Sequence, residues 1–542
     1  MDMHEQPTES WRGADPGQGG IGSVPQPAPP ASQPEAMATE SPKRLSRRAL
    51  FAGLAGAGAA VAIGGVALAE WQQSQQNQVA SSWNTTGTSG ANAKLGHLLR
   101  RTGFGVTSAD LALYTPLGFQ GAVDRLLNYQ QVSDQPLEQQ LAAANIDLTK
   151  PQNQQRWWLL RMAGSQRPLL EKMTLFWHGV LTSSYQKVGG PKAYMRMIVQ
   201  NNFLRAHAFD TFDNILLGIT SDPAMLFYLD LTKSRKNAPN ENFARELMEL
   251  FTLGLGNYTQ QDVFEGAAAL TGWHVRGTSL QAQYYPGDHT DNELSFLGQK
   301  GNLDYKDVIH TLTNHPAAPW FLCRKLFTFF VYENPSNDDL KPLVDTYVKS
   351  NHSIQAVMKT LLLSPQFSSA KAYRARVKSP TEFVIGSYRA LEAKTSGAEL
   401  PTQTYLLGQT LFNPPNVAGW PADKISSLWL NGGTWMSRLN YINLLIAGAR
   451  SRTSVYKPLD FQSIVDTNNI DTPEKFVDHF SSFLLDGALE NERKDQLVSY
   501  FNTPDPLSRQ GHITLSGGKS YPLSKVRGTL YLMMASPEYQ LN

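Results

Sequence analysis

The sequence predicts an all-α fold, a large multi-helix domain with long irregular loops, and three observations support this prediction. Apolar residues recur at helical spacing through most of the chain, whereas runs that alternate apolar and polar residues, as strands do, are scarce. Helix boundaries carry capping signals: Thr259 and Asp262 form a capping-box pattern, and Gly272 closes the helix that they begin. With 41% hydrophobic and 10% aromatic residues, the chain can bury a large core.

The composition of residues 1–48 and 70–93 predicts a disordered leader and a flexible linker. Residues 1–48 are rich in Pro, Gly, Gln and Ser and contain too few apolar side chains to form a core, so we expect them to be disordered. Residues 70–93 are dominated by Gln, Ser, Asn, Thr and Gly, which suits a flexible linker. One large helical domain is therefore expected over residues 94–542.

Residues 49–69, between these segments, predict an export signal. The pair Arg47-Arg48 precedes an uncharged run of mostly Ala, Gly, Val, Leu and Ile that ends in Ala67-Leu68-Ala69, a pattern that signal peptidases accept. This predicts that the twin-arginine translocation machinery exports the chain and leaves it periplasmic, extracellular or tethered to the membrane. A helix of about 20 apolar residues can span a bilayer, so an uncleaved segment 49–69 would make the only membrane contact.

Charge and cysteine content exclude several classes of protein. The 48 Lys and Arg residues nearly balance the 46 Asp and Glu residues, and the basic residues are scattered, so neither a nucleic-acid partner nor a polybasic membrane patch is expected. The single cysteine, Cys323, lies in an apolar helical stretch and excludes an intramolecular disulfide and cysteine-based zinc or iron–sulfur sites. We expect Cys323 to be a buried core thiol.

Helical periodicity predicts the order of the elements that follow the linker. The first predicted helices cover residues 94–101, 108–114, 119–128, 153–163, 169–178, 190–201 and 209–221. A later stretch, residues 273–301, contains Gly, Pro, His, Asp and Tyr without a sustained period and predicts a long irregular loop. Such loops on a rigid scaffold often carry function.

Residues 240–251 form the densest polar arrangement in the chain. On a helix that turns about 100° per residue, the polar residues fall within an arc of roughly 140° and the apolar residues fill the rest. The polar face contains Glu241, Asn242, Arg245, Glu246 and Glu249. One interpretation is a solvated face with two ion pairs, from Arg245 to Glu241 and to Glu249. The other is a site in which Arg245 keeps one carboxylate ionised, while Glu246 or Glu249 acts as an acid, a base or a metal ligand.

Five blocks of sequence carry a resemblance to a known family. They are residues 97–105, residues 176–179 with Thr182 and Ser183, residues 240–254, residues 267–273, and residues 412–421 with 429–431 and 437–438. From His97 to the C-terminus the chain resembles the bacterial family named domain of unknown function 1800. The resemblance implies an exported protein and leaves the activity open.

One departure from the family pattern concerns His178. Similar proteins usually read Trp-His-x-His-Phe where this chain has Trp177-His178-Gly179-Val180-Leu181, so the second histidine is missing. This weakens a two-histidine metal site. His178 can still act alone as a base or a ligand, or it can be a structural residue at a helix end.

Two loops supply further candidates. His289 and Asp291 resemble a His-Asp block of the family, shifted by an inserted Thr290, and such groups bind a metal or form a base and its orienting partner; an ordinary surface loop is the alternative. Trp273 precedes this loop, and Trp420 lies in the proline-rich segment 413–421. Rigid aromatic loops suit sugar-binding clefts, but they also suit packing between helices.

Two hypotheses about function follow. In the first, the protein is an exported hydrolase-type enzyme that acts on envelope or extracellular carbohydrate. Glu246 and Glu249 are its acid and base, and Arg245 and Glu241 set their electrostatics. The expected cleft contains Asn242, Trp273, His289, Asp291 and Trp420. A divalent metal in this site stays an open alternative. In the second hypothesis the protein is a non-catalytic helical scaffold that binds a polymer, and the polar helix is an internal ion-pair network.

Overall fold

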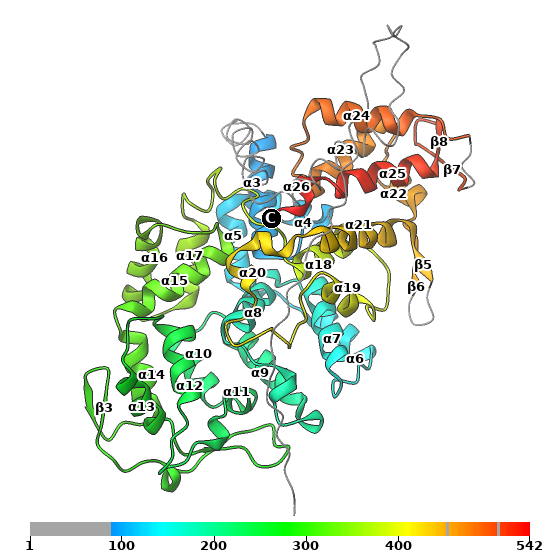
Figure 1. The fold of residues 1–542 in the computed structure, drawn as a ribbon. Coiled ribbons are helices and arrows are strands. Elements are labelled where there is room, and N and C mark those ends of the chain that lie inside the picture. The colour runs from blue at the N-terminus through cyan, green and yellow to red at the C-terminus, as the bar shows by residue number, and fades with distance from the viewer. Residues whose placement is uncertain (1–87, 451–454, 507–509) are drawn as a thin grey trace, which may run out of the picture. The chain divides into compact units, whose positions relative to one another are not determined.

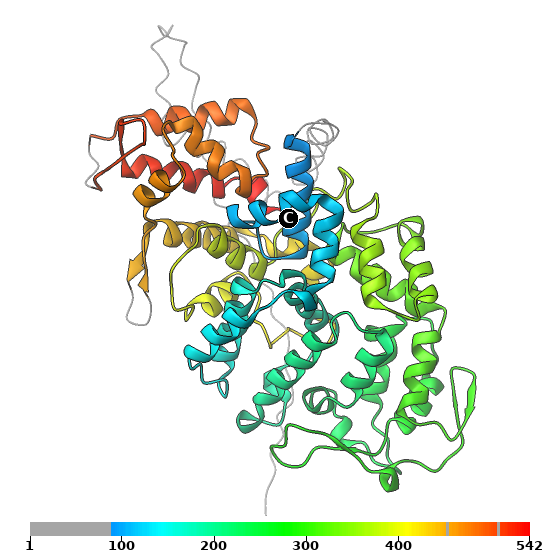
Figure 2. The ribbon, with the colours of Figure 1, turned by 180° about the vertical axis from the view of Figure 1, so that it is seen from behind.

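The all-α prediction is confirmed. The computed structural model describes residues 88–450, 455–506 and 510–542, and both views show helices throughout, interrupted by short hairpins (Figures 1 and 2). The described residues all belong to one compact unit. The predictions for the leader, the export signal and most of the linker lie outside the described residues. No described helix has the length and apolar character that crossing a membrane requires.

The helices predicted for the first part occur in the predicted order, and a further helix, Gln135–Ala143, was not predicted. Ser108–Tyr114 begins where predicted because the Thr107 hydroxyl and the Asp110 carboxylate form a capping box. The predicted helix 190–201 begins instead at Met195, after a 3₁₀ turn at Pro191–Ala193. The helices are α3 (Thr88–Thr102), α4 (Ser108–Tyr114), α5 (Gly118–Leu127), α6 (Gln135–Ala143), α7 (Pro151–Gly164), α8 (Pro168–Val180), α9 (Met195–Ala206), α10 (Phe212–Thr220) and α11 (Pro223–Tyr228).

The later helices include one irregular segment, η6 (Leu247–Thr252), which is a π-helix that continues α12 (Glu241–Glu246). The capping box of Thr259 and Asp262 is confirmed at the start of α13 (Gln260–Ala269). The others are α14 (Tyr305–Asn314), α15 (Ala317–Phe330), α16 (Asn337–Lys349), α17 (Ile354–Leu362), α18 (Pro380–Ala390), α19 (Leu400–Leu406), α20 (Pro421–Lys424), α21 (Gly432–Ala447), α22 (Phe461–Thr467), α23 (Pro473–Leu484), α24 (Asn491–Asn502), α25 (Leu523–Met534) and α26 (Pro537–Gln540).

The strands form antiparallel pairs of neighbours in sequence. The pairs are β1 (Trp273–His274) with β2 (Gln283–Tyr284), β3 (Leu294–Phe296) with β4 (Gln299–Gly301), β5 (Ala449–Arg450) with β6 (Val455–Tyr456), and β7 (His512–Thr514) with β8 (Ser520–Pro522). The prediction of an irregular loop over residues 273–301 is therefore wrong in part, since this segment contains two hairpins. Gly272 precedes β1 at a φ of 100°, and a Cβ there would lie 2.8 Å from the Tyr284 ring, so a glycine is required.

Buried arginines tie helix ends together. Arg100 and Arg101 are 3% and 2% exposed, whereas arginines ordinarily lie at the surface. Arg101 donates to the carbonyl oxygens of Phe330 and Val331 at 2.8 and 2.7 Å, at the end of α15. These carbonyls need donors because the last turn of a helix leaves its carbonyls without partners in the helix. Arg100 forms an ion pair with Asp486. Cys323 is buried, as predicted.

The C-terminal residues are bound to the segment before α18. The Asn542 amide donates to the Arg376 carbonyl at 2.7 Å, and the Lys378 amide donates to the Gln540 carbonyl at 2.9 Å. The Asn542 side chain also donates to Glu382, which pairs with the buried Lys172 of α8. This arrangement fixes α8 and α18 against the end of the chain.

Candidate active site

The predicted polar face is present, and it spans the α-helix α12 and the π-helix η6 that continues it. Asn240 caps α12 by accepting from the Asn242 amide at 3.0 Å. Beyond Glu246 the pattern changes to i→i+5: the Leu253 amide donates to the Met248 carbonyl at 2.8 Å, and the Thr252 hydroxyl donates to the Leu247 carbonyl at 2.6 Å. The predicted arc assumed α-helical spacing throughout, so it does not apply at Glu249. The polar residues are half-buried, and Phe243, Ala244, Leu247, Met248 and Phe251 are buried.

Arg245 makes one of the two predicted ion pairs. It pairs with Glu241 at 3.0 Å and donates to the Gln260 side chain at 3.0 Å. Gln260 in turn donates to Glu241 at 2.9 Å, which closes a triangle between α12 and α13. Glu249 accepts instead from the Tyr258 hydroxyl at 2.6 Å, so the predicted pair of Arg245 with Glu249 is wrong. The structure brings Glu241 and Arg245 together and gives Glu249 a different partner.

Glu246 differs from its neighbour in charge environment. Its pKa is raised above the ordinary glutamate value, first by burial and then by the negative charge of Glu249, against the opposing charge of Arg245. Its carboxylate forms no hydrogen bond or ion pair with any described residue. The pKa of Tyr228 is raised, first by burial and then by the nearby charge of Glu246. Two neighbouring carboxylates therefore stand in unequal surroundings.

His178 lies in the interior. Its Nε2 accepts from the Phe412 amide at 3.0 Å, and its ring meets the Trp158 and Trp420 rings edge-on, with centroids 5.3 and 5.5 Å away. Burial lowers its pKa to about 3, so the ring is neutral and serves as an acceptor. These contacts favour the structural interpretation of His178.

The proline-rich segment 413–421 packs against the residues that come just after His178 in the sequence. Thr182 donates to the Val417 carbonyl at 2.6 Å, and the Ser184 hydroxyl lies 2.6 Å from the Asn413 side-chain oxygen, to which it donates. Gly419 has a φ of 79°, and a Cβ there would overlap the carbonyl of Gly179. Two of the sequence blocks that carry the family resemblance are thus in direct contact.

Trp273, His289 and Asp291, which were predicted to share a cleft, have different environments in the structure. The Trp273 ring packs on Tyr284 and Tyr305 at 5.2 and 5.1 Å. His289 is also buried, 6.1 Å from the Tyr284 ring. Asp291 is 81% exposed and pairs with Lys236, so it does not orient His289. Among the described residues no group of three or more His, Cys, Asp or Glu side chains is placed to hold a metal ion.

Trp420 lines a cavity of about 450 Å³ together with two residues that the sequence analysis missed, Lys325 and Asp423. Burial raises the pKa of Asp423 to about 7 and lowers that of Lys325 to about 8. The only sign of Lys325 in the sequence was its position as a charged residue within the mostly apolar run of α15. Nothing in the sequence indicated the burial of Asp423. The predicted carboxylates Glu246 and Glu249 do not line this cavity.

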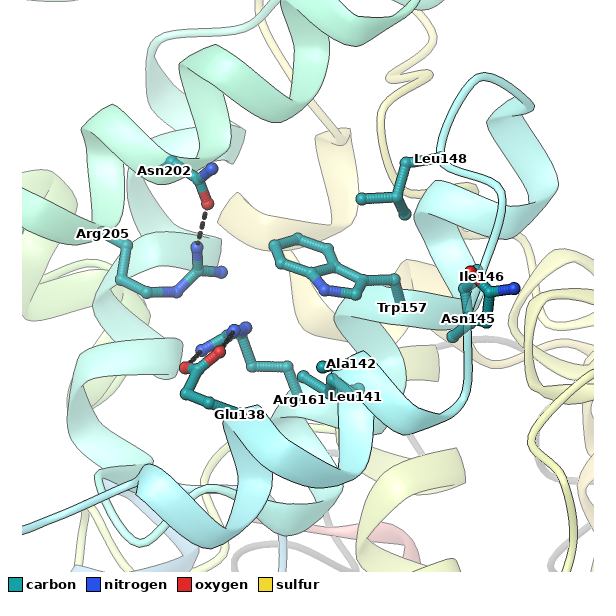
Figure 3. A pocket seen from close by; sticks show the side chains of 10 residues that line it. All are labelled: Glu138, Leu141, Ala142, Asn145, Ile146, Leu148, Trp157, Arg161, Asn202 and Arg205. Atoms are coloured by element: carbon teal, nitrogen blue, oxygen red, sulfur yellow. Dashed lines mark hydrogen bonds and ion pairs between the residues drawn. The ribbon is translucent and has the colours of Figure 1, made fainter.

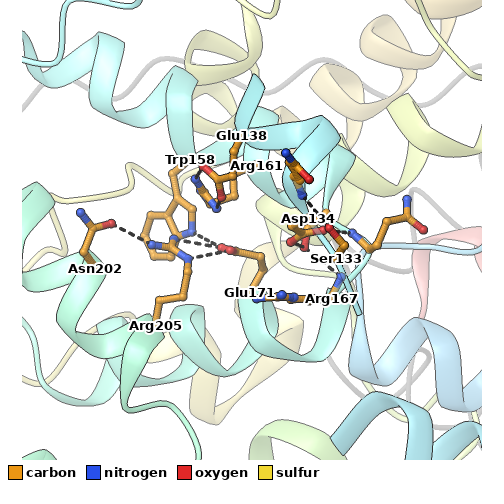
Figure 4. Close-up of polar contacts among 12 residues, drawn as sticks. Ser133, Asp134, Glu138, Trp158, Arg161, Arg167, Glu171, Asn202 and Arg205 are labelled. Atoms are coloured by element: carbon orange, nitrogen blue, oxygen red, sulfur yellow. Dashed lines mark hydrogen bonds and ion pairs between the residues drawn. The ribbon is translucent and has the colours of Figure 1, made fainter. Parts of the chain in front are cut away.

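A second cavity of about 590 Å³ contains charged groups that are already paired (Figure 3). Arg161 binds both oxygens of Glu138 at 2.6 and 2.7 Å. Arg205 binds both oxygens of Glu171, which also accepts from the Trp158 indole at 3.0 Å (Figure 4). Because each cation has a carboxylate partner, this network is accounted for as a link between α6, α7, α8 and α9.

Comparison with known proteins gives a family and no activity. A model of the family described as "Protein of unknown function (DUF1800)" matches residues 97–541. No curated protein and no solved structure matches the chain. The matched region includes α12, η6, His178 and the proline-rich segment. The chain therefore belongs to the DUF1800 family.

Proposed function

We propose that this protein is an exported hydrolase-type enzyme that cleaves envelope or extracellular carbohydrate, with Glu246 and Glu249 as its acid–base pair. The observation that carries the proposal is the unequal environment of the two carboxylates. Glu246 has a raised pKa and no partner among the described residues, whereas Glu249 accepts from the Tyr258 hydroxyl. A proton donor beside an ionised carboxylate is the arrangement that glycoside cleavage uses.

The roles follow from these surroundings. Glu246 holds its proton to a higher pH than an ordinary glutamate and donates it to the leaving oxygen. Glu249 stays an acceptor and activates water or attacks the sugar carbon. The triangle of Arg245, Glu241 and Gln260 holds α12 against α13, and the charge of Arg245 limits the rise in the pKa of Glu246. Asn242 lies on the same half-buried face and is available to a polar substrate.

Location is the second part of the proposal. The pair Arg47-Arg48 and the uncharged run that follows support export through the twin-arginine machinery. The mature protein is then periplasmic, extracellular or tethered, and it meets polysaccharide there.

A non-catalytic scaffold is the second candidate, and one observation favours it. The Arg245–Glu241–Gln260 triangle joins two helices, as a packing device would. In that case the polar face specifies how α12 meets α13, and its substitution lowers stability and changes no turnover.

The experiment that tests the proposal is a substrate screen. The mature chain, residues 70–542, is incubated with peptidoglycan, chitin, xylan, cellulose and starch, and new reducing ends are measured. A variant that combines Glu246→Gln and Glu249→Gln serves as the blank, and Glu293→Gln, at an exposed glutamate, is the matched control. We expect release from at least one polymer by the wild type and the control, and about a hundredfold less from the double variant. Release by the double variant at the wild-type rate contradicts the proposal.

A further inference from the structure

The cavity that contains Trp420 is built mainly from three parts of the fold, and Asn334 and Pro335, between α15 and α16, complete its lining. α8 supplies Val180, α15 supplies Phe321, Lys325 and Phe329, and the segment around α20 supplies Trp420 and Asp423. Its volume, about 450 Å³, falls within the range of small-molecule sites. The α20 segment lies close to α8 at Gly179, where a Cβ would be only 3.0 Å from a carboxylate oxygen of Asp423. The absence of a side chain at Gly179 therefore leaves room for the Asp423 carboxyl.

The walls are mostly apolar. Phe329 and Phe321 are partly exposed to the cavity, and the buried Trp420 closes it beside the ring of His178. Aromatic walls bury flat or acyl groups well. The apolar body of a ligand would therefore lie between α15 and the α20 segment.

Two charged side chains that line this cavity, Lys325 and Asp423, are not used to hold the fold together. Neither the Lys325 ammonium nor the Asp423 carboxyl forms a hydrogen bond or ion pair with a described side chain or backbone group. The Lys325 ammonium lies 4.8 Å from the centroid of the Phe321 ring. By contrast Arg324, on the same helix, is occupied by the Pro335 carbonyl and the Asn337 side chain, at 2.9 and 3.0 Å. A partly buried ammonium and carboxyl without partners are poised to meet a ligand.

The charge of the lining favours an anion. Arg324, Lys325 and Lys424 are cationic, and Asp423 is the single acidic side chain in the lining. The pKa of Asp423, raised to about 7 by burial, makes its neutral form accessible below neutrality. The other charged groups that act on Asp423 are Arg376, Glu382, Lys172 and Lys325, and those that act on Lys325 are Lys424 and Asp423.

We propose that this cavity binds a small organic carboxylate with an aromatic or acyl body. Its apolar part packs between Phe321, Phe329 and Trp420. Its carboxylate accepts from the Lys325 ammonium, and the neutral Asp423 carboxyl donates a second hydrogen bond to it. The site is separate from the glutamate pair, so it stands or falls independently of the proposed hydrolase activity.

Calorimetric titration of the mature chain with 4-phenylbutyrate tests the proposal. At about pH 6 we expect saturable binding, at least about tenfold weaker binding of the neutral 4-phenylbutanol, and a similar loss for Lys325→Met. Lys349→Met, at an exposed lysine of α16, is the matched control and keeps the wild-type affinity. At about pH 8.5 we expect the wild type to bind more weakly, because Asp423 is then ionised and the Lys325 ammonium, with a pKa of about 8, has largely lost its proton. Asp423→Asn is affected by the second change alone, so we expect it to lose less affinity than the wild type.

A second variant guards against misfolding of the first. Thr328→Trp places a ring at the partly exposed Thr328, which lines the cavity, and removes no charge; we expect it to block binding while the melting temperature is kept. The proposal is overturned if the wild type shows no saturable binding of 4-phenylbutyrate, or if Lys325→Met and Thr328→Trp, both folded, bind it as tightly as the wild type does.

Discussion

Glu246 is the residue on which the acid–base account depends most. Burial and the charge of Glu249 raise its pKa, and the charge of Arg245 opposes them. If Glu246 donates the proton, activity persists above the ordinary glutamate range and falls as the pH passes its raised pKa. Arg245→Met removes the opposing charge, so we predict that the alkaline limb of kcat/KM moves to higher pH. Arg276→Met, at an exposed arginine, leaves the limb unchanged. A limb that stays in place or moves down in Arg245→Met contradicts the assignment.

His178 gives a prediction that separates a structural role from a catalytic one. His178→Phe removes the acceptor of the buried Phe412 amide, which leaves that donor unpaired. We expect the free energy of unfolding in urea to fall by about 1–3 kcal/mol. Turnover per folded molecule stays within about threefold of the wild type, whereas loss of a general base costs about a hundredfold or more. His310→Phe, at an exposed histidine, is the control.

The pH dependence of stability at His178 has a defined sign. Its folded pKa, about 3, is below the ordinary histidine value, so the unfolded chain binds the proton more tightly. The contribution of His178 to stability is therefore complete above about pH 6.5 and is lost as the pH falls toward the folded value.

At the scale of elements, the contact between α8 and the proline-rich segment makes a sharp prediction. Gly419→Ala must place a Cβ against the Gly179 carbonyl at a positive φ. We expect the free energy of unfolding to fall by more than about 2 kcal/mol. Gly432→Ala, in the first turn of α21 with no atom within 4 Å of the added Cβ, is the matched control and changes stability by less than about 1 kcal/mol. Equal effects of the two substitutions would contradict the assigned packing.

Local signals made some elements predictable. The capping boxes at Thr107 and Thr259 set the starts of α4 and α13, because their bonds lie within four residues of sequence. The amphipathic split of residues 241–251 identified the buried face of α12 correctly. These features depend on neighbours along the chain, so the sequence contains them directly.

Other elements depend on irregular local geometry or on contacts that are distant in sequence. The π-helical pattern of η6 and the pairing of Glu249 with Tyr258 were not visible, since helical spacing is assumed to be regular when a sequence is read. The environment of Asp423 is set by Arg376, Glu382 and Lys172, up to about 250 positions away, which no local pattern encodes. The short hairpins within residues 273–301 were missed because two- and three-residue strands carry too little alternation.

For the whole molecule, the export proposal predicts where the protein is found. Arg47→Lys combined with Arg48→Lys keeps the charge and removes the pair that the translocation machinery recognises. We expect the protein to be retained in the cytoplasm, as measured by cell fractionation and immunoblotting. Lys43→Arg combined with Arg44→Lys is the matched control and is exported normally. Normal export of the Arg47 and Arg48 variant would contradict the twin-arginine assignment.

The proposed acid–base activity is a property of the whole molecule, and one measurement tests it most directly. Turnover of the best polysaccharide and the free energy of unfolding are measured together for the wild type, Glu246→Gln and Glu249→Gln. The acid–base account predicts that each variant loses about a hundredfold or more in turnover while its unfolding free energy changes by less than about 1 kcal/mol. Unchanged turnover with a large loss of stability would contradict it and assign the polar helix to the scaffold.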